Sequence, residues 1–330
     1  MEYAYLGRTG VRVSEICLGT MTFGNEADEA ESVRIMDRAA DAGVNFFDTA
    51  DIYSRGESER ITGRWLEGKR DGIVLASKVH FATGEGINEG GSSRLHILRG
   101  VEASLKRLRT DRLDILYLHH WDDHAAIEES LGAIDHLVRQ GKVLYAAVSN
   151  FSAWQTMKAI AAARERGLAP IVAIQPQYSL LKRLAEVEIL PMAADAGLGV
   201  CPYSPMAAGL LTGKYQRNEA GRISTHPLYI ERYKDPVHRE VSDKFVAYAI
   251  ANGHEPGALA VAWVVGHPAV TSAIVGARNL AQFEAALKAV DIRLDEETRA
   301  AISDLSVEPP LPTERERTAY RVVMMNPRKP

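Results

Sequence analysis

The sequence predicts one closed (β/α)8 barrel, also called a TIM barrel, in which eight parallel strands form the wall and helices surround them. Eight short apolar runs, many of them β-branched, have the profile of strands that are covered on both faces. Longer stretches with helical periodicity separate these runs, and the alternation continues over most of the 330 residues. Eight strand and helix units in one chain of this length favour a closed barrel over an open doubly wound sheet.

The strands are expected at short ranges spaced along the whole chain. These ranges are 15–18, 44–48, 73–78, 113–119, 143–149, 171–175, 199–203 and 271–276. Helices are expected between them, at 29–42, 57–68, 93–108, 126–140, 153–166 and 186–196. Several of these helices are followed by a glycine, namely Gly43, Gly141, Gly167 and Gly197, which suits the left-handed residue that commonly ends a helix.

Three segments fall outside this alternation. Residues 3–13, with the turn Gly7-Arg8-Thr9-Gly10, predict a β-hairpin that closes the barrel floor. Residues 203–236 are rich in Gly, Pro, Tyr and Arg and are too long for an ordinary connection, so we expect a functional loop. Residues 306–330 form a tail that either drapes over the barrel mouth or is a mobile terminus. The whole chain, 1–330, is expected to be a single domain.

The composition is that of a globular protein and argues against several function classes. The chain is 46% hydrophobic with a net charge of -4, and its lysines and arginines are dispersed, so neither nucleic acid nor an anionic membrane is expected as a partner. The amino terminus lacks the pattern of a secretory signal, and no run approaches the roughly 20 apolar residues of a membrane span. The two cysteines, Cys17 and Cys201, are expected to be buried small hydrophobes. These observations predict a cytoplasmic protein.

Four ionisable side chains stand at or just past the ends of successive expected strands: Asp48, Tyr53, Lys78 and His119. The carboxyl ends of the strands of a parallel barrel converge, so residues up to seventy positions apart meet in one pocket. Taken singly, a strand-end Asp is often a cap and a loop Tyr is often packing. The convergence of all four instead indicates chemistry on a carbonyl group.

Lys78 is the most informative of the four residues, because a lysine that closes an apolar strand needs a partner to stay charged. Asp48 is the obvious candidate. A phenol has an ordinary pKa of about 10, and a nearby ammonium stabilises the phenolate and lowers that pKa. We therefore expect Asp48 to hold Lys78, Lys78 to tune Tyr53 as a proton donor, and His119 to donate to a substrate oxygen.

Two other segments carry residues of a possible site. His119, His120 and His124 lie among aspartates and offer metal ligands. Adjacent strand residues point to opposite faces, however, so two of these histidines are not expected to reach one ion, and no metal is predicted. Residues 84–90 resemble a dinucleotide-binding glycine motif, but the spacing is one residue too long and two glutamates would repel a pyrophosphate.

Short motifs then occur in one order along the chain. They are Leu6-Gly7-Arg8-Thr9-Gly10, Leu18-Gly19-Thr20-Met21-Thr22-Phe23-Gly24, the 48–53 stretch, Ser77-Lys78, 114–119, Val148-Ser149-Asn150-Phe151, Gln175-Pro176-Gln177-Tyr178, Tyr203-Ser204-Pro205, Gly213-Lys214-Tyr215 and 274–278. Each motif is weak alone, but the ordered series is specific. By it the chain resembles the aldo-keto reductases over essentially its full length, to about residue 305.

The resemblance implies an NADPH-dependent oxidoreductase that reduces aldehydes or ketones to alcohols by hydride transfer, without metal. In that family Tyr53 would donate the proton, Lys78 and Asp48 would tune it, and His119 would orient and polarise the carbonyl. These roles agree with the physics, because hydride addition develops negative charge on the oxygen and preplaced donors stabilise that charge. Phe23 and Trp121, with parts of the tail, are expected to form walls of the substrate site.

The resemblance also implies how NADPH is held. Ser149, Asn150 and Gln175 would bind the carboxamide, and the Tyr203 ring would stack on the nicotinamide. The phosphates would lie along 203–214, and Arg278 with Gln282 would meet the 2′-phosphate, for which a forked guanidinium is well suited. The remaining expected cofactor residues are Thr20, Met21, Asp48, Ser204, Pro205, Lys214 and Gly276.

One departure and two alternatives remain open at this stage. Ala285-Ala286 stands where many relatives have Glu-Asn, which puts the geometry of adenine binding in doubt. The first alternative is a nucleotide-binding redox-sensing or regulatory subunit with little turnover, since fold alone does not decide function. The second is a metal-dependent barrel hydrolase built on the histidine cluster. The oligomeric state does not follow from the sequence.

Overall fold

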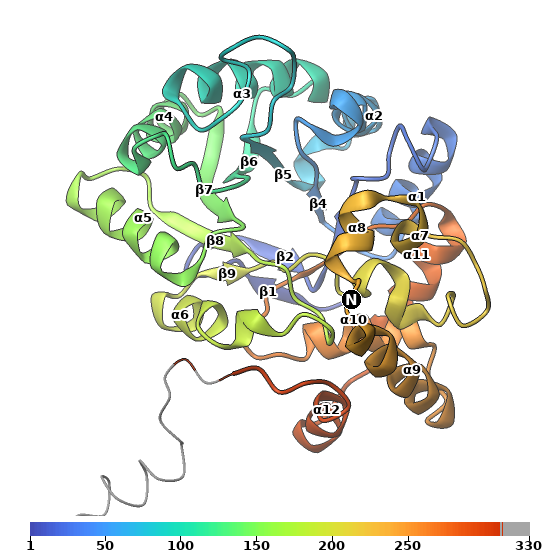
Figure 1. Cartoon of the computed structure of the whole chain (residues 1–330). Coiled ribbons are helices and arrows are strands. Elements are labelled where there is room, and N and C mark those ends of the chain that lie inside the picture. Colours follow the sequence, from blue (N-terminus) through green and yellow to red (C-terminus); the bar gives the residue numbers. More distant parts are fainter. Residues whose placement is uncertain (311, 313–330) are drawn as a thin grey trace, which may run out of the picture.

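Eight parallel strands curl into the wall of a barrel in the computed structural model, which describes residues 1–310 and 312. Their order is β10-β3-β4-β5-β6-β7-β8-β9, so β3 to β9 pair in sequence order and β10 pairs with β3. The residues after β9 close the barrel against β10: Ile274 N donates to Pro202 O at 2.9 Å, and Tyr203 forms a parallel bridge with Ile274. Helices surround the strands (Figure 1), which confirms the predicted (β/α)8 class.

The strand positions agree with the prediction, with ends that shift by a few residues. They are β3 (Ile16–Gly19), β4 (Phe46–Asp48), β5 (Val74–Val79), β6 (Leu113–Leu118), β7 (Val143–Ser149), β8 (Ile171–Gln175), β9 (Gly199–Val200) and β10 (Ala273–Val275). β9 is shorter than the expected 199–203, and Pro202 has no N–H to donate to a neighbouring strand. The chain still follows β8 beyond that point, because Cys201 N donates to Ile174 O at 3.0 Å.

All six predicted helices are present. They are α1 (Glu29–Asp41), α2 (Glu57–Leu66), α3 (Arg94–Leu108), α4 (Ile127–Arg139), α5 (Ala153–Glu165) and α6 (Ile189–Ala196). Four longer helices in the last third were not predicted: α9 (Pro236–Ala251), α10 (Pro256–Val265), α11 (Leu280–Leu287) and α12 (Glu296–Ser303). Most of α10 is buried, so it lacks the polar face whose periodicity would reveal a helix.

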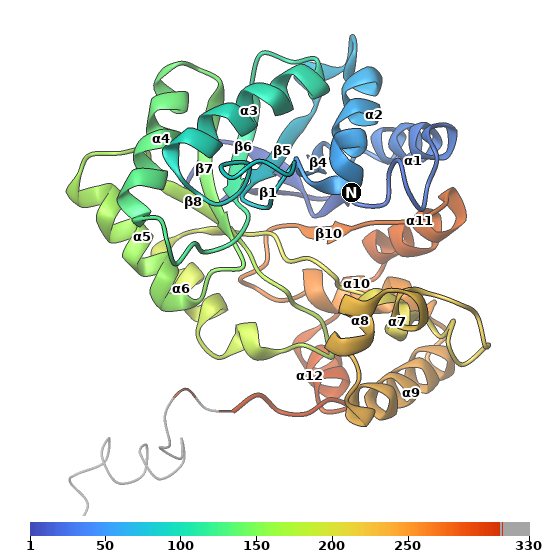
Figure 2. The same ribbon diagram turned by 45° about the horizontal axis from the view of Figure 1, so that its top comes forward.

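The segment 203–236 contains three short helical pieces: η4 (Ala207–Thr212), α7 (Arg222–Thr225) and α8 (Pro227–Arg232). They pack together beside α9 and α10 on one side of the barrel (Figure 2). The expected functional loop is therefore an ordered, folded segment that lies after β9.

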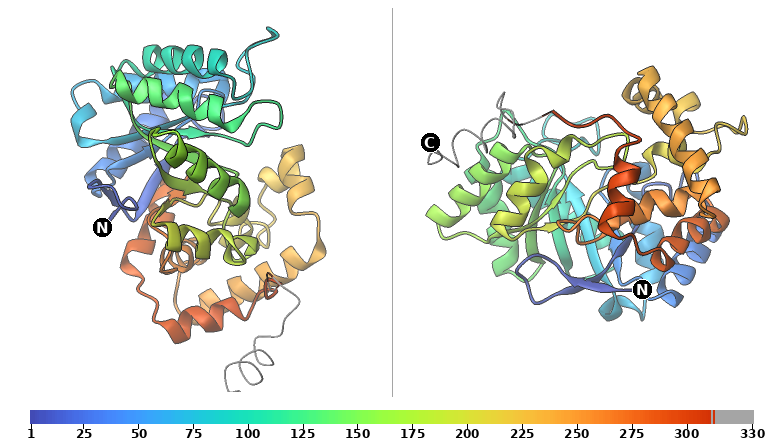
Figure 3. Two further views of the ribbon diagram at one scale, coloured as in Figure 1. Left: turned by 90° about the vertical axis from the view of Figure 1, so that its left-hand side faces the viewer. Right: turned by 90° about the horizontal axis from the view of Figure 1, so that it is seen from below.

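The amino-terminal hairpin is present as predicted, with β1 (Tyr3–Tyr5) paired antiparallel to β2 (Arg12–Ser14) (Figure 3). Leu6 and Val13 are fully buried and pack with residues of the barrel interior such as Phe46. At Gly7, φ is +56°, and a Cβ atom would lie 2.6 Å from Gly199 N. Glycine is needed there because the turn approaches the start of β9 so closely.

The remaining expectations about the fold concern burial and the tail. Cys17 and Cys201 are both free and buried. No helix in the described residues has both the length and the apolar character needed to span a membrane. Most of the predicted tail lies outside the described residues.

Candidate active site

The four predicted ionisable residues meet at the carboxyl ends of β4, β5 and β6. Lys78 Nζ donates to Asp48 Oδ1 at 2.5 Å, to Thr49 O at 2.8 Å and to the Tyr53 hydroxyl at 3.2 Å. The His119 and Tyr53 rings meet edge to face, with centroids 5.9 Å apart. Parallel register explains the meeting, because β4, β5 and β6 are consecutive neighbours in the wall.

A tight backbone turn sets the position of Tyr53. Ser54 and Arg55, which follow it, both have left-handed conformations, with φ of 49° and 55°. The Ser54 hydroxyl donates to Phe23 O at 2.7 Å, which ties this turn to the loop after β3. Such conformations are uncommon outside glycine and persist where surrounding contacts hold them.

Lys78 is a fully buried ammonium. Burial is the largest single effect and lowers the pKa of Lys78, but the charges and hydrogen bonds of Asp48 and Tyr53 together raise it by more, so the pKa lies above its ordinary value. Gln175 completes the arrangement by donating its side-chain amide to Asp48 Oδ2 at 2.9 Å. Both oxygens of Asp48 thus have partners, as a buried carboxylate requires.

The pKa of Tyr53 is shifted in the direction opposite to the one expected from the sequence. Burial raises the pKa of the phenol, and the Lys78 ammonium offsets this only in part, so the pKa lies above its ordinary value. The expectation of a lowered pKa was wrong because it counted the ammonium but neither the desolvation of the hydroxyl nor the charge of Asp48. Tyr53 is therefore a neutral phenol near neutral pH, with an ammonium beside it that stabilises the phenolate once a proton leaves.

His119 is an uncharged imidazole near neutral pH. Burial lowers its pKa well below the ordinary value, and Lys78, His80 and His120 add to this effect. Its Nδ1 atom is buried and has no hydrogen-bond partner among the described residues. The Phe81 ring meets the imidazole edge to face, with centroids 4.9 Å apart.

The residues expected to hold a nicotinamide form one connected set beside these four. Asn150 Nδ2 donates to His119 O at 2.9 Å, and the Tyr203 hydroxyl donates to Asn150 Oδ1 at 2.8 Å. The Ser149 hydroxyl donates to Gln175 O at 3.0 Å. Asn150 and Ser204 both adopt left-handed backbone conformations, with φ of 58° and 61°. The chain therefore turns sharply after β7 and after β9.

Positive charge gathers between the 203–236 segment and the end of β10. Burial lowers the pKa of Lys214 to about 8, with Arg278 and then Arg222 contributing through their charges. The Lys214 side chain passes close to Gly209 and Gly221, where an added Cβ atom would lie 2.5 Å from it in each case. Such a cluster is suited to an anion.

Arg222 was not singled out from the sequence. It forms two hydrogen bonds with Glu26, at 3.1 Å and 3.0 Å, which link α7 to the loop before α1. Only its place in the Gly- and Arg-rich segment could have indicated it. Gln282, which was expected to meet a phosphate, accepts from Arg278 N at 3.2 Å.

The other predicted residues differ in how deeply they are buried. Thr20 is buried and its hydroxyl lies 2.7 Å from Ser58 Oγ, whereas Met21 and Gly276 are exposed. Phe23 is fully buried in the core, so its ring offers no surface to a ligand and its expected place in a substrate wall is wrong. Pro205 is buried.

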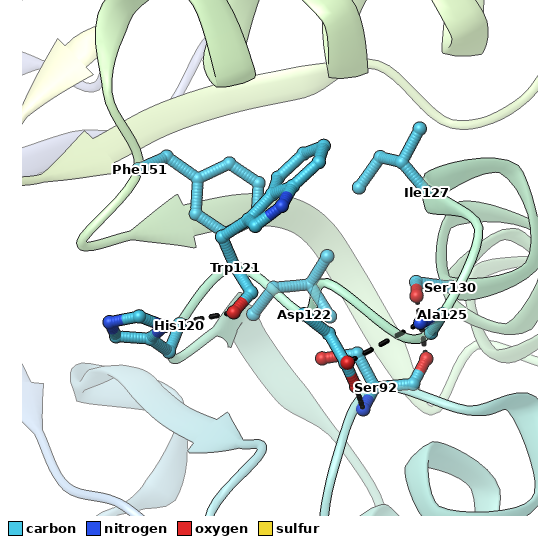
Figure 4. Close-up of a pocket in the computed structure, with 9 residues that line it drawn as sticks. Ser92, His120, Trp121, Asp122, Ala125, Ile127, Ser130 and Phe151 are labelled. Atoms are coloured by element: carbon cyan, nitrogen blue, oxygen red, sulfur yellow. Dashed lines mark hydrogen bonds between the residues drawn. The ribbon is translucent and has the colours of Figure 1, made fainter.

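Trp121, the other residue expected in a substrate wall, is half-buried in the loop after β6. Its ring packs against Phe151, with centroids 5.3 Å apart, over a small cavity that Ser92 and Asp122 also line (Figure 4). Asp122 accepts backbone N–H groups from Ser92 at 2.6 Å and His124 at 2.9 Å. These bonds fix the loop that carries Trp121.

Ala286 lies in α11 and is buried in the core, so its methyl group packs inward. Residues 84–89 form an exposed irregular loop. Within residues 1–310 and 312, no group of three or more His, Cys, Asp or Glu side chains is arranged to hold a metal ion.

Comparison with known proteins decides the family. The sequence model of the aldo/keto reductase family matches residues 15–307. The chain belongs to the aldo/keto reductase family. An uncharacterized oxidoreductase of Bacillus subtilis, YrpG, is 42% identical over 318 residues, which are 92% of this chain and 96% of that protein.

Two further relatives have different descriptions. A probable voltage-gated potassium channel subunit beta of Arabidopsis thaliana is 37% identical over 306 residues, 88% of this chain and 92% of that protein. Norsolorinic acid reductase of Aspergillus flavus is 33% identical over 312 residues, 89% of this chain and 78% of that protein. The family and its oxidoreductase members support carbonyl reduction as the general activity of this aldo/keto reductase.

Proposed function

We propose that this chain is an NADPH-dependent reductase of aldehydes or ketones, with Tyr53 as the general acid. The observation that carries the proposal is the buried Lys78 ammonium, which contacts both Asp48 and the Tyr53 hydroxyl beside the uncharged His119. Reduction of a carbonyl places negative charge on its oxygen, and two donors aimed at that oxygen lower the barrier. Tyr53 and His119 provide these donors.

The residues around the pocket fit a nicotinamide dinucleotide phosphate. Asn150, Ser149 and the Tyr203 ring would hold the nicotinamide end, and Lys214 and Arg278 would hold phosphate groups. When bound, the cofactor supplies the hydride. Gln175 binds Asp48 through its amide nitrogen, so we propose that it orients the carboxylate as well as reaching toward a carboxamide.

Each protein group has one task in the proposed reaction. Tyr53 gives its proton to the carbonyl oxygen, and the Lys78 ammonium stabilises the phenolate that remains. Asp48 keeps Lys78 charged within the barrel, as the raised pKa of this lysine indicates. His119 is uncharged, so it orients the carbonyl by hydrogen bonding without adding a positive charge that would compete with Lys78.

A preference for NADPH over NADH follows from the cations. Burial lowers the pKa of Lys214 to about 8, and the charges of Arg278 and Arg222 lie close enough to contribute. A 2′-phosphate between them would relieve this repulsion, and NADH lacks that phosphate.

The test is to measure oxidation of NADPH and of NADH by the purified protein across a panel of carbonyl compounds, from small aldehydes to bulky cyclic ketones. We expect turnover with NADPH and a KM for NADH that is at least about tenfold higher. Tight NADPH binding without turnover on any member of the panel would instead favour a redox-sensing or regulatory subunit.

A further inference from the structure

Two arginine side chains pack on the ring of Tyr229 in α8, and they differ in whether a carboxylate balances their charge. Arg222 and Arg232 each place the guanidinium carbon 5.3 Å from the centre of that ring. Arg222 is paired with Glu26 through two hydrogen bonds, at 3.1 Å and 3.0 Å. Arg232 is half-buried and forms no ion pair within residues 1–310 and 312.

The carboxylates nearest to Arg232 in the sequence are engaged elsewhere. Glu231 accepts from Lys234 Nζ at 2.5 Å, and Asp235 accepts a backbone N–H at 3.0 Å, where it caps the start of α9. A partly desolvated charge without a counterion costs free energy, and a bound anion would recover it. The described residues therefore leave the charge of Arg232 available to a ligand.

Arg232 acts on the proposed active site through Tyr203. Burial raises the pKa of the Tyr203 hydroxyl, the Arg232 charge opposes this rise, and Tyr53 adds to it. The Tyr203 hydroxyl also donates to Asn150 Oδ1 at 2.8 Å, and Asn150 Nδ2 donates to His119 O at 2.9 Å. Tyr203 is thus hydrogen-bonded into the active-site set and lies within the electrostatic reach of Arg232.

Lys182, which follows β8, adds a second cation beside the same set. Its ammonium lies 5.7 Å from the centre of the Tyr233 ring. The Tyr233 hydroxyl accepts from Gln177 Nε2 at 3.3 Å, and Gln177 forms a parallel bridge with Tyr203. Contacts therefore run from Lys182 to the ring that is proposed to meet the nicotinamide.

The two cations lie near each other. Burial lowers the pKa of Lys182, the Arg232 charge adds to this effect, and Asp235 opposes it only in part. The cofactor phosphates are assigned above to Lys214 and Arg278. Arg232 and Lys182 are thus left for another anion, and a guanidinium presents a fork of donors that matches a carboxylate or a phosphate.

We propose that Arg232 and Lys182 bind an anionic group of the carbonyl substrate, a carboxylate or a phosphate, with Arg232 as a specificity-determining residue. This inference rests on the proposed function, because it names the class of carbonyl compound that the site takes. The link through Tyr203 to Tyr53 and His119 favours a substrate over an anion bound independently of the reaction.

The experiment compares carbonyl compounds that differ in one anionic group. The acids 4-oxobutanoate, 5-oxopentanoate and 6-oxohexanoate are each paired with the methyl ester, and glyceraldehyde 3-phosphate is paired with glyceraldehyde. We expect wild type to prefer the anionic member of at least one pair by about tenfold in kcat/KM, and Arg232→Gln to lose most of that preference. The pairs that show the preference distinguish a carboxylate from a phosphate.

Two control variants and a binding measurement accompany the comparison. Arg232→Lys keeps the charge without the fork of donors and should retain part of the preference. Arg99→Gln, which removes an exposed arginine from α3, should leave the preference as in wild type. NADPH should bind Arg232→Gln within about twofold of wild type. NADPH binding weakened about tenfold in Arg232→Gln would overturn the inference, because Arg232 would then hold a phosphate of the cofactor.

Failure of the proposed function gives a different result from failure of the inference. If wild type reduces no member of any pair, the proposed function fails, and calorimetric binding of the three acids and of glyceraldehyde 3-phosphate in the presence of NADP⁺ decides the inference. Binding about tenfold weaker in Arg232→Gln supports it. Binding that is absent in wild type or equal in both proteins would overturn it, as would equal kcat/KM for the two members of every pair in wild type.

Discussion

Lys78 Nζ lies 3.2 Å from the hydroxyl oxygen of Tyr53, although the two residues belong to separate strand and helix units of the barrel. The lysine is fully buried and the phenol keeps its proton near neutral pH, because burial raises the pKa of Tyr53. This contact therefore joins a permanent positive charge to a group that can give up a proton.

Tyr53→Phe should leave nucleotide binding within about twofold of wild type and lower turnover by at least about 100-fold, since it removes the proton donor and keeps the ring. Steady-state reduction of an aldehyde, with NADPH affinity from fluorescence titration, measures both effects. Tyr145→Phe, the same change at the barrel floor, is the matched control and should behave as wild type. Undiminished turnover in Tyr53→Phe would refute the acid assignment.

Lys78→Met should destabilise the fold by about 3–5 kcal/mol, because it leaves the Asp48 carboxylate buried without its counterion. Adding Asp48→Asn should restore part of that loss, since an amide carries no charge to bury. Urea denaturation of the single and double variants measures the difference. A double variant no more stable than Lys78→Met would mean that the two groups do not stabilise each other as an ion pair.

Arg278→Gln should weaken NADPH binding about tenfold and leave NADH binding nearly unchanged, because only NADPH carries the 2′-phosphate that the guanidinium would meet. Fluorescence titration with both nucleotides gives the two affinities. Arg239→Gln, on the exposed surface of α9, removes the same charge from a distant position. Equal weakening of both nucleotides by Arg278→Gln would place the 2′-phosphate elsewhere.

Asp51 should make the fold less stable as the pH rises. Both of its oxygens are buried without a hydrogen-bond partner, and burial, together with the nearby Glu59 charge, raises its pKa from 3.8 to about 7. A raised carboxyl pKa favours the folded state while the group is protonated. This contribution is complete below pH 3.8 and is lost as the pH rises through about 7.

Asp51→Asn should therefore be more stable than wild type at pH 8, by roughly 1–4 kcal/mol, and closer to wild type at pH 5. The free energy of unfolding in urea at the two pH values measures this. Asp195→Asn, an exposed position on α6, should show no such dependence. If wild type and Asp51→Asn respond equally to pH, the carboxyl group is not the titrating group.

Local sequence pattern predicted the eight barrel strands and the first six helices. Each strand covered by helices is an apolar run, and most of the first six helices have an amphipathic period, so both appear in the sequence. The pattern failed at α10, whose residues are buried on nearly every side and show no helical period. It also failed within 203–236, where short helical pieces are held by contacts with distant segments such as Glu26.

The sequence by itself determined the order of strands and helices and the presence of Asp48, Tyr53, Lys78 and His119 at the ends of neighbouring strands, because both depend on residue type and spacing. Only the tertiary structure decided the raised pKa of Tyr53, the complete burial of Phe23, the isolation of Asp51 and the packing of Trp121 against Phe151. Those properties depend on how much water and charge the rest of the folded chain leaves around each group. Residues far apart in the sequence set that environment together.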